Sequence, residues 1–278
     1  MNEEIDGIKI SNPSRIVYPK QKITKLDVAL YYQSVSKYMM PYLEKRLLSV
    51  IRAHQGIKGE LFFKKHPKTE NKLIKKFAIE KDKEEYFYLP NEKAIIYQAQ
   101  MGTIEFHIWA SKVSSINKPD IMTFDLDPDK KVSIEMLREG VKNLKKVIDK
   151  LKLKSFLKTS GGKGYHVLVP FNASYSWEEF EDFAKNIALY LEGQYPDLYT
   201  SNIRKASRKG KIFIDYMRNG RGATCACPYS LRARDGAKIS MPISWNDLER
   251  VAPNEVDIFN YKSYLKKNPW RNFFKSLK

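Results

Sequence analysis

The sequence predicts an α+β fold in which two β-sheet lobes are flanked by helices and a cleft lies between them. Strand-like segments dominate residues 47–110, and strands and helices alternate from residue 121 onward. No internal repeat, low-complexity tract or Pro/Gly/Ser linker separates these parts. We therefore expect a single domain over residues 1–278, with a β-rich lobe over about 1–115 and a second lobe over about 116–278.

The N-terminal lobe is predicted to begin with a helix followed by an antiparallel sheet. Thr24 and Asp27 form a helix-start signature, and apolar residues recur at helical spacing after them until Pro41, where we expect the helix to end. Segments rich in β-branched, aromatic and aliphatic residues then predict strands over residues 47–53, 61–65, 94–99 and 103–110.

The second lobe is predicted to mix strands with two amphipathic helices. The helix over 133–151 carries one apolar stripe, and the helix over 176–192 opens with a capping box formed by Ser176 and Glu179. The predicted strands cover residues 121–126, 155–159, 165–170 and 211–215.

The net charge predicts a polyanionic partner. Lys and Arg outnumber Asp and Glu by 50 to 32, a net charge of +18, which favours nucleic acid. Lysines that only solvate helix faces are the alternative, and a membrane surface is a weaker one. No apolar run approaches the ~20 residues that span a bilayer, and the polar start MNEEIDGIK is unlike a signal peptide. We expect a cytoplasmic, nucleoid-associated protein without membrane contact.

An acidic motif at a predicted strand end indicates a metal site. Asp125 and Asp127 are two residues apart on one strand, so they share a face, and Pro128 stops the strand. Asp215 ends another apolar strand. If these strands are neighbours, three carboxylates could hold two Mn²⁺ or Mg²⁺ ions. A solvated turn is the alternative for the acidic pair alone.

A glycine-rich turn indicates an anion site. In residues 158–166, KTSGGKGYH, glycines expose backbone N–H groups beside the donors Ser160, Lys163 and His166. The turn is not a P-loop, because no Ser or Thr follows the Gly-Lys pair, and a plain β-hairpin is the alternative. Basic segments flank Asp215, and Arg232 could reach a triphosphate.

Aromatic and sulfur residues give weaker signals. Phe62 and Phe63 precede Lys64, a combination that lets bases stack while phosphates are neutralised, although one ring should face the core. His107 on a predicted strand is ordinarily structural. Cys225 and Cys227 are too close for an ordinary disulfide and have no zinc-finger spacing, so we expect buried thiols.

Five motifs in order, EFHIW, FDLDP, KTSGGKGYHVLVP, FIDY and YSLRAR, resemble the polymerase domain of bacterial and archaeal non-homologous end-joining DNA ligase D, within the archaeo-eukaryotic primase superfamily. The resemblance extends from Asn12 to Trp245 and implies the primase-polymerase fold. It implies metal binding by Asp125, Asp127 and Asp215. It implies nucleotide binding by Arg52, Phe62 or Phe63, His107, Ser160, Lys163, His166, Arg208 and Arg232. It also implies that Arg15 and Lys25 hold a DNA 5′-phosphate.

The resemblance implies a metal-dependent polymerase, a nucleotidyltransferase that adds nucleotides, often ribonucleotides, at DNA ends and gaps. Its substrates would be nucleoside triphosphates and DNA with a 5′-phosphate, gaps or overhangs. The chain has no room for a ligase, so a ligase and a Ku-like partner are expected in trans. Tyr216, Cys225 and Cys227 are departures from the expected pattern. The alternatives are a replicative-type primase, a non-catalytic basic nucleic-acid-binding module and, third, a metal-dependent nuclease.

Overall fold

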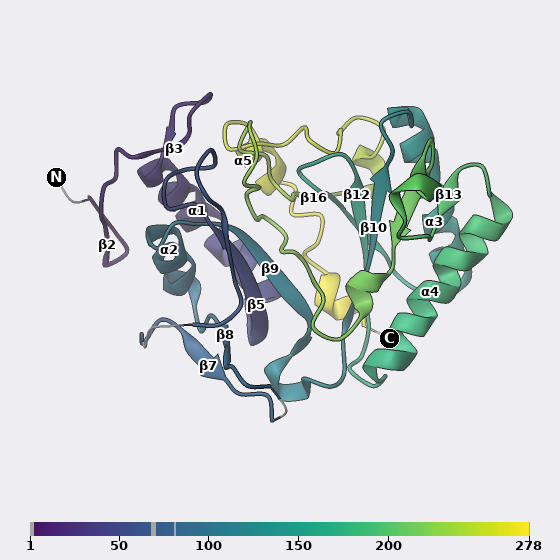
Figure 1. Ribbon diagram of the computed structural model, residues 1–278, viewed down its shortest axis with the longest axis horizontal. Helices are drawn as coiled ribbons and strands as arrows, with labels where there is room; N and C mark the ends of the chain where they lie inside the picture. Colours follow the sequence, from purple (N-terminus) through teal and green to yellow (C-terminus); the bar gives the residue numbers. More distant parts are fainter. Residues whose placement is uncertain (1–2, 68–70, 81, 278) are drawn as a thin grey trace.

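The computed structural model describes residues 3–67, 71–80 and 82–277 (Figure 1). Both ends of the predicted domain, residues 1 and 278, lie outside them. Two main sheets organise the described residues. The six-stranded sheet has the order β13-β14-β10-β12-β11-β16, and its strands in chain order are β10 (Ile121–Pro128), β11 (Phe156–Thr159), β12 (Tyr165–Pro170), β13 (Tyr199–Thr200), β14 (Ile212–Asp215) and β16 (Pro242–Ile243).

The four-stranded sheet has the order β15-β9-β5-β6 and belongs mostly to the N-terminal part of the chain. Its strands are β5 (Arg46–Arg52), β6 (Phe62–Lys64), β9 (Thr103–Lys112) and β15 (Thr224–Ala226). Three two-stranded sheets accompany it: β1 (Glu3–Ile5) with β2 (Ile8–Ile10), β3 (Ile16–Tyr18) with β4 (Ile23–Thr24), and β7 (Lys75–Phe77) with β8 (Tyr86–Tyr88).

The helices flank the two main sheets. Those in the described residues are α1 (Lys25–Leu43), α2 (Glu92–Gln100), α3 (Ile134–Lys150), α4 (Trp177–Gln194) and the short α5 (Tyr261–Leu265). Helices α1 and α2 lie beside β5 and β9, whereas α3 and α4 lie on the far side of the six-stranded sheet (Figure 1). The predicted α+β class with two sheet lobes is therefore confirmed.

Local signals set the helix starts as predicted. Thr24 and Asp27 form a reciprocal capping box at α1, and Ser176 and Glu179 form one at α4. Helix α1 runs to Leu43, two residues beyond the predicted end at Pro41. A proline in the last turn removes one hydrogen bond only, and Tyr42 and Leu43 are buried in the core, which favours continuation of the helix.

The predicted strand over 94–99 is wrong, because this segment is helix α2. A short apolar run fits either a buried strand or a buried helix. The side chain of Asn91 decides between them, since it accepts a hydrogen bond from the backbone of Ala94 and caps the helix. Ile95, Ile96 and Ala99 are then buried, and α2 packs against α1.

The remaining predicted strands and helices are present with ends shifted by a few residues. Strand β6 is shorter than predicted and forms the edge of its sheet. No helix in the described ranges is both long and apolar enough to cross a membrane.

Candidate active site

The register of the six-stranded sheet aligns the predicted catalytic residues. Strand β10 pairs antiparallel with both β12 and β14, and Asp125 lies opposite His166 on one side and Asp215 on the other. Residues directly opposite each other point to the same face. Lys158 on β11 lies opposite His166 and extends this row. Asp127, two residues after Asp125, projects to the same face, so the three acids share one face of the sheet.

Arg218 stands against two of these acids. Its Nε atom is 3.0 Å from Oδ2 of Asp215 and 3.7 Å from Oδ2 of Asp125. The 3₁₀ helix that carries it, η3 (Met217–Asn219), follows β14 directly. Buried Asn219 fixes η3 to β10, because its side chain accepts from the N–H of Thr123 at 2.7 Å and donates to the carbonyl of Thr123 at 2.8 Å. The fold thus places the guanidinium of Arg218 against Asp125 and Asp215.

The three carboxyl groups have different electrostatic environments. Burial would raise the pKa of Asp125, but His166 and Arg218 hold it well below the ordinary value. The pKa of Asp127 is raised by partial loss of solvent and by the charge of Asp125. Burial also raises the pKa of Asp215, and Arg218 offsets only part of this. Clustered carboxylates of this kind gain from an added cation.

The residue types at the site fit a hard divalent cation. Carboxylate oxygens are the ligands that Mg²⁺ and Mn²⁺ prefer. In the described residues, however, no three His, Cys, Asp or Glu side chains form a ready-made metal site. Arg218 lies against Asp125 and Asp215, so these side chains would have to rearrange before the acids could share a metal ion.

A buried polar cluster lies beside the acids. Nε2 of His166 is 3.3 Å from Oδ1 of Asp125, and Nδ1 is 2.6 Å from Nζ of Lys158, which also contacts Oγ of Ser240 at 2.6 Å. Burial lowers the pKa of Lys158. Burial and Lys158 would lower the pKa of His166, but Asp125 and Cys225 raise it more. Sequence reasoning gives Lys158 no role, although the hairpin turn that joins β11 to β12 pairs it with His166.

Cys225 is part of this cluster. Its Sγ atom lies 3.4 Å from Nδ1 of His166. Burial would raise the pKa of the thiol, but His166 and Lys158 lower it to about 7. Both cysteines are buried and free, as predicted, yet only Cys225 contacts a predicted site residue. Nothing in the sequence signalled this contact, because it joins β15 of one sheet to β12 of the other.

The glycine turn between β11 and β12 is closely packed. Oγ of Ser160 accepts from the N–H groups of Gly162 at 3.0 Å and Gly164 at 3.2 Å. A Cβ atom on Gly161, whose φ is +67°, would lie 2.6 Å from Cγ of Arg232, and one on Gly164 would lie 1.9 Å from a backbone oxygen. The glycines therefore serve close approach as well as the turn. The side chain of Lys163 is exposed.

Arg232 joins this turn to the four-stranded sheet. Its Nη1 donates to the carbonyl of Ser160 at 2.6 Å, and its Nε donates to Oε2 of Glu105 at 3.0 Å. Oε2 of Glu105 also lies 2.8 Å from Nε2 of His107. Burial lowers the pKa of His107, although Glu105 offsets part of that effect. Glu105 stands in the EFHIW motif, but sequence reasoning assigns it no role.

Three predicted nucleotide-binding residues lie at the β5–β6 edge. Nη2 of Arg52 donates to the side chain of Gln98 at 3.1 Å. Phe62 is half-buried and packs against the ring of His54, while Phe63 is 52% exposed. The expectation that one ring belongs to the core is wrong, because β6 is a three-residue edge strand. The exposed ring of Phe63 remains accessible for stacking.

Arg208 lies near Asp127 because it stacks on the aromatic ring of Phe213. Its guanidinium carbon is 3.4 Å from the centre of the Phe213 ring, and Phe213 lies opposite Asp127 in the β10–β14 register. Its Nη2 donates to the carbonyl of Ile203 at 2.7 Å. This stacking holds a cation beside Asp127.

The two predicted 5′-phosphate residues are neighbours with different surroundings. Nζ of Lys25 is buried and donates to the carbonyl of Ser11 at 2.8 Å and to the side chain of Gln100 at 2.7 Å. Burial and the charge of Arg15 lower its pKa to about 8. Nε of Arg15 is buried without a hydrogen-bond partner. The backbone N–H of Lys25 donates to the carbonyl of Arg15 at 2.8 Å.

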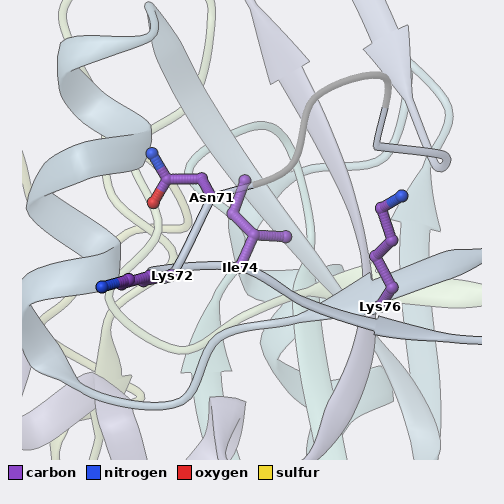
Figure 2. A pocket seen from close by; sticks show the side chains of 4 residues that line it. All are labelled: Asn71, Lys72, Ile74 and Lys76. Atoms are coloured by element: carbon purple, nitrogen blue, oxygen red, sulfur yellow. The ribbon is translucent and has the colours of Figure 1, made fainter.

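A separate surface hollow lies beside β7 (Figure 2). Asn71, Lys72, Ile74 and Lys76 line it, and Lys76 forms an ion pair with Glu85 at 3.3 Å. None of the predicted site residues lines this hollow.

The two main sheets, with paired carboxylates beside a glycine turn, define the class as a mixed α/β protein. Residues 24–270 match the family model described as LigD, primase-polymerase domain. The chain therefore belongs to the LigD primase-polymerase domain family.

Curated relatives and a solved structure agree with this assignment. The chain is 35% identical over 248 residues to the multifunctional non-homologous end joining protein LigD of Pseudomonas aeruginosa, covering 88% of this chain and 30% of that protein. It is 27% identical over 244 residues to the bifunctional non-homologous end joining protein LigD of Bacillus subtilis, covering 87% and 39%. The chain thus spans well under half the length of these relatives.

The structure is similar to that of the polymerase domain from Mycobacterium tuberculosis Ligase D in complex with DNA. The TM-score is 0.88 and the sequence identity is 24%, over 96% of this chain and 98% of the other. This similarity confirms the predicted fold.

Proposed function

We propose that this protein is a metal-dependent polymerase that adds nucleotides, ribonucleotides included, at DNA ends and gaps during non-homologous end joining. One observation carries the proposal: the sheet register sets Asp125 directly between Asp215 and His166. Membership of the LigD primase-polymerase family supports it, as do relatives described as non-homologous end joining proteins.

Asp125, Asp127 and Asp215 would hold two Mn²⁺ or Mg²⁺ ions. Such ions activate an attacking 3′-hydroxyl and stabilise the leaving oxygen in phosphoryl transfer. Arg218 would move off the carboxylates as the ions bind. The partial exposure of its side chain, 42%, leaves room for this movement.

Basic side chains beside the acids would hold the triphosphate. Lys163 is exposed on the glycine turn, Arg232 lies across that turn, and His166 lies next to Asp125. Together they would neutralise the charge that develops on the departing pyrophosphate. His107 is joined to Arg232 through Glu105, which supports its place on the same nucleotide.

DNA would approach over the remaining basic residues. The net charge of +18 favours binding to phosphates. Phe63 would stack on a base, with Arg52 and Arg208 against nucleotide or template. Arg15 and Lys25 would receive the 5′-phosphate of a gap, and the unpartnered Nε of Arg15 is suited to a phosphate oxygen. A ligase and a Ku-like protein are the partners we propose in trans, at the nucleoid.

The proposal is tested by replacing one of the three acids. We expect Asp127→Ala to reduce nucleotide incorporation in a primer-extension assay by at least about a thousandfold, because loss of a metal ligand removes several kcal/mol of transition-state stabilisation. Affinity for gapped DNA should be nearly unchanged. Asp197→Ala, which alters an exposed aspartate away from the row, is the matched control.

Three outcomes would contradict the proposal. Extension by the Asp127→Ala variant at the wild-type rate would remove the metal-bound acids from the mechanism. A wild-type protein that binds DNA but shows no Mn²⁺-dependent nucleotide binding by calorimetry would be a non-catalytic binding module. Dinucleotide synthesis without a primer would indicate a replicative-type primase instead.

A further inference from the structure

Glu105 is a buried carboxylate to which the proposed mechanism gives no role. It lies on β9, and its side chain is only 4% exposed. A buried charge is tolerated only when it is paired and hydrogen-bonded. Burial would raise the pKa of Glu105, but His107, Arg232 and the backbone of Ala233 lower it to about 2. The group is therefore a fixed anion.

The two carboxylate oxygens hold different parts of the site. Oε2 contacts Nε of Arg232 at 3.0 Å and Nε2 of His107 at 2.8 Å. Oε1 accepts from the backbone N–H of Ala233 at 2.7 Å. One oxygen thus orients two side chains, and the other holds the backbone next to Arg232.

Arg232 is held from the opposite side as well. Its Nη1 donates to the carbonyl of Ser160 at 2.6 Å, and its own carbonyl accepts from the hydroxyl of Tyr18 at 2.9 Å. Gly161 leaves space for its Cγ atom. An arginine has five N–H donors, so its contacts with Glu105 and Ser160 leave further donors for a phosphate. The guanidinium is preoriented before any ligand arrives.

We propose that Glu105 is a positioning residue for the nucleotide: it holds Arg232 and His107 together in the orientation that binds the polyphosphate of a nucleoside triphosphate. The inference rests on the proposed function and extends it. The nucleotide site is built mostly on the six-stranded sheet, and we assign its alignment to one carboxylate of the four-stranded sheet. Preorganised donors bind charge without paying for reorganisation.

A double-mutant cycle tests whether Glu105 acts through Arg232. The variants are Glu105→Gln, Arg232→Gln and the combination of both, assayed for the KM of nucleotide, kcat, DNA affinity and thermal unfolding. Glutamine has the size of glutamate, but its amide offers one acceptor oxygen, so one of the two sets of donors loses its partner. We expect Glu105→Gln to raise the KM for nucleotide about tenfold, with a smaller change in kcat.

The combined variant should be no more than about twofold worse than Arg232→Gln alone, because the two residues act as one unit. Asp120→Asn is the matched control, since Asp120 is a buried carboxylate that accepts from Arg46 at 2.6 and 2.8 Å and directly precedes β10, at the end of the strand away from Asp125 and Asp127. It should lower the melting temperature and leave the KM unchanged. DNA affinity should be the same in every variant.

Effects of Glu105→Gln and Arg232→Gln that multiply in the combined variant would overturn the inference, as would a folded Glu105→Gln variant with an unchanged KM. If Glu105→Gln does not fold, Glu105→Asp keeps the charge but withdraws it by one methylene. It should raise the KM in the same direction, and an unchanged KM would again overturn the inference.

Failure of the proposed function has a different signature. A wild-type protein without incorporation would defeat that function, and the same cycle would then be measured as the dissociation constant for ATP by calorimetry. Weaker ATP binding by Glu105→Gln would still support the positioning role, and unchanged binding would overturn it.

Discussion

Two arginine–carboxylate contacts in this molecule have opposite characters. Arg232 and Glu105 are enclosed, with side chains 13% and 4% exposed. Arg218 meets Asp125 and Asp215 in a more open setting, where its own side chain is 42% exposed and the carboxylates are 18% and 14% exposed. Glu105 also receives two further contacts, from His107 and the backbone of Ala233.

This difference distinguishes Glu105, a carboxylate with fixed partners, from Asp125 and Asp215, whose cationic partner can be exchanged. A carboxylate whose oxygens are all engaged in the dry interior cannot lose a partner cheaply. An ion pair that reaches solvent contributes little, because water and salt replace the partner. Glu105 is thus suited to fix other side chains, whereas Asp125 and Asp215 are suited to exchange Arg218 for another cation.

The largest effect in this comparison is expected for the stability of Glu105→Gln at neutral pH. The pKa of Glu105 in the folded protein is about 2, below its ordinary value. A depressed carboxyl pKa stabilises the fold at pH above the unfolded value, and this stability is lost as pH falls through the folded value. We expect the wild type to exceed Glu105→Gln in free energy of unfolding by on the order of 3 kcal/mol at neutral pH.

Urea unfolding at a series of pH values measures this difference. The gap between the two proteins should shrink as pH falls from the ordinary range of a glutamate, about 4.3, towards 2. A difference in free energy of unfolding that stays constant over this range would show that the charge of Glu105 does not stabilise the fold. The contrast with Asp215 would then be wrong.

A smaller effect is expected for Arg218→Gln on metal binding. A divalent cation bound as we propose would compete with Arg218 for Asp125 and Asp215. Removal of the Arg218 guanidinium should therefore raise the affinity for Mn²⁺ about tenfold, close to the upper value of a partly exposed ion pair. Calorimetric titration of Mn²⁺ without DNA or nucleotide measures this. Arg221→Gln, three residues further along the same segment, is the control. Unchanged or weaker binding would mean that Arg218 does not occupy the cation position.

The smallest effect is expected at the predicted 5′-phosphate residues, where the same contrast recurs between cations. Lys25 is enclosed by Ser11 and Gln100, whereas Nε of Arg15 has no partner. We expect Arg15→Gln to reduce the preference for a 5′-phosphorylated gap by about threefold, measured by fluorescence anisotropy. Lys25→Met should reduce this preference less than Arg15→Gln does, because Nζ of Lys25 is bound to Ser11 and Gln100, and it should also lower the melting temperature. Equal loss of preference in both variants would contradict this difference between the two cations.

Local sequence patterns predicted much of this structure because their interactions are short-range. The capping boxes at Thr24 and Ser176 formed as expected. Alternation on a strand placed Asp125 and Asp127 on one face, and a five-residue turn sets Lys158 opposite His166. The apolar run over 94–99 is compatible with both a strand and a helix, and the helix cap that decides between them lies at a single residue, Asn91.

The sequence by itself determined the α+β class, the acidic strand ends, the glycine turn and a net charge of +18, all of which follow from residue type and local spacing. Only the tertiary structure decided that β14 would lie beside β10, that Arg218 would meet the acids, and that Glu105 would join Arg232 to His107. These contacts join residues distant along the chain, and strand order and burial select them. No local pattern specifies which distant charge becomes the partner of a buried carboxylate.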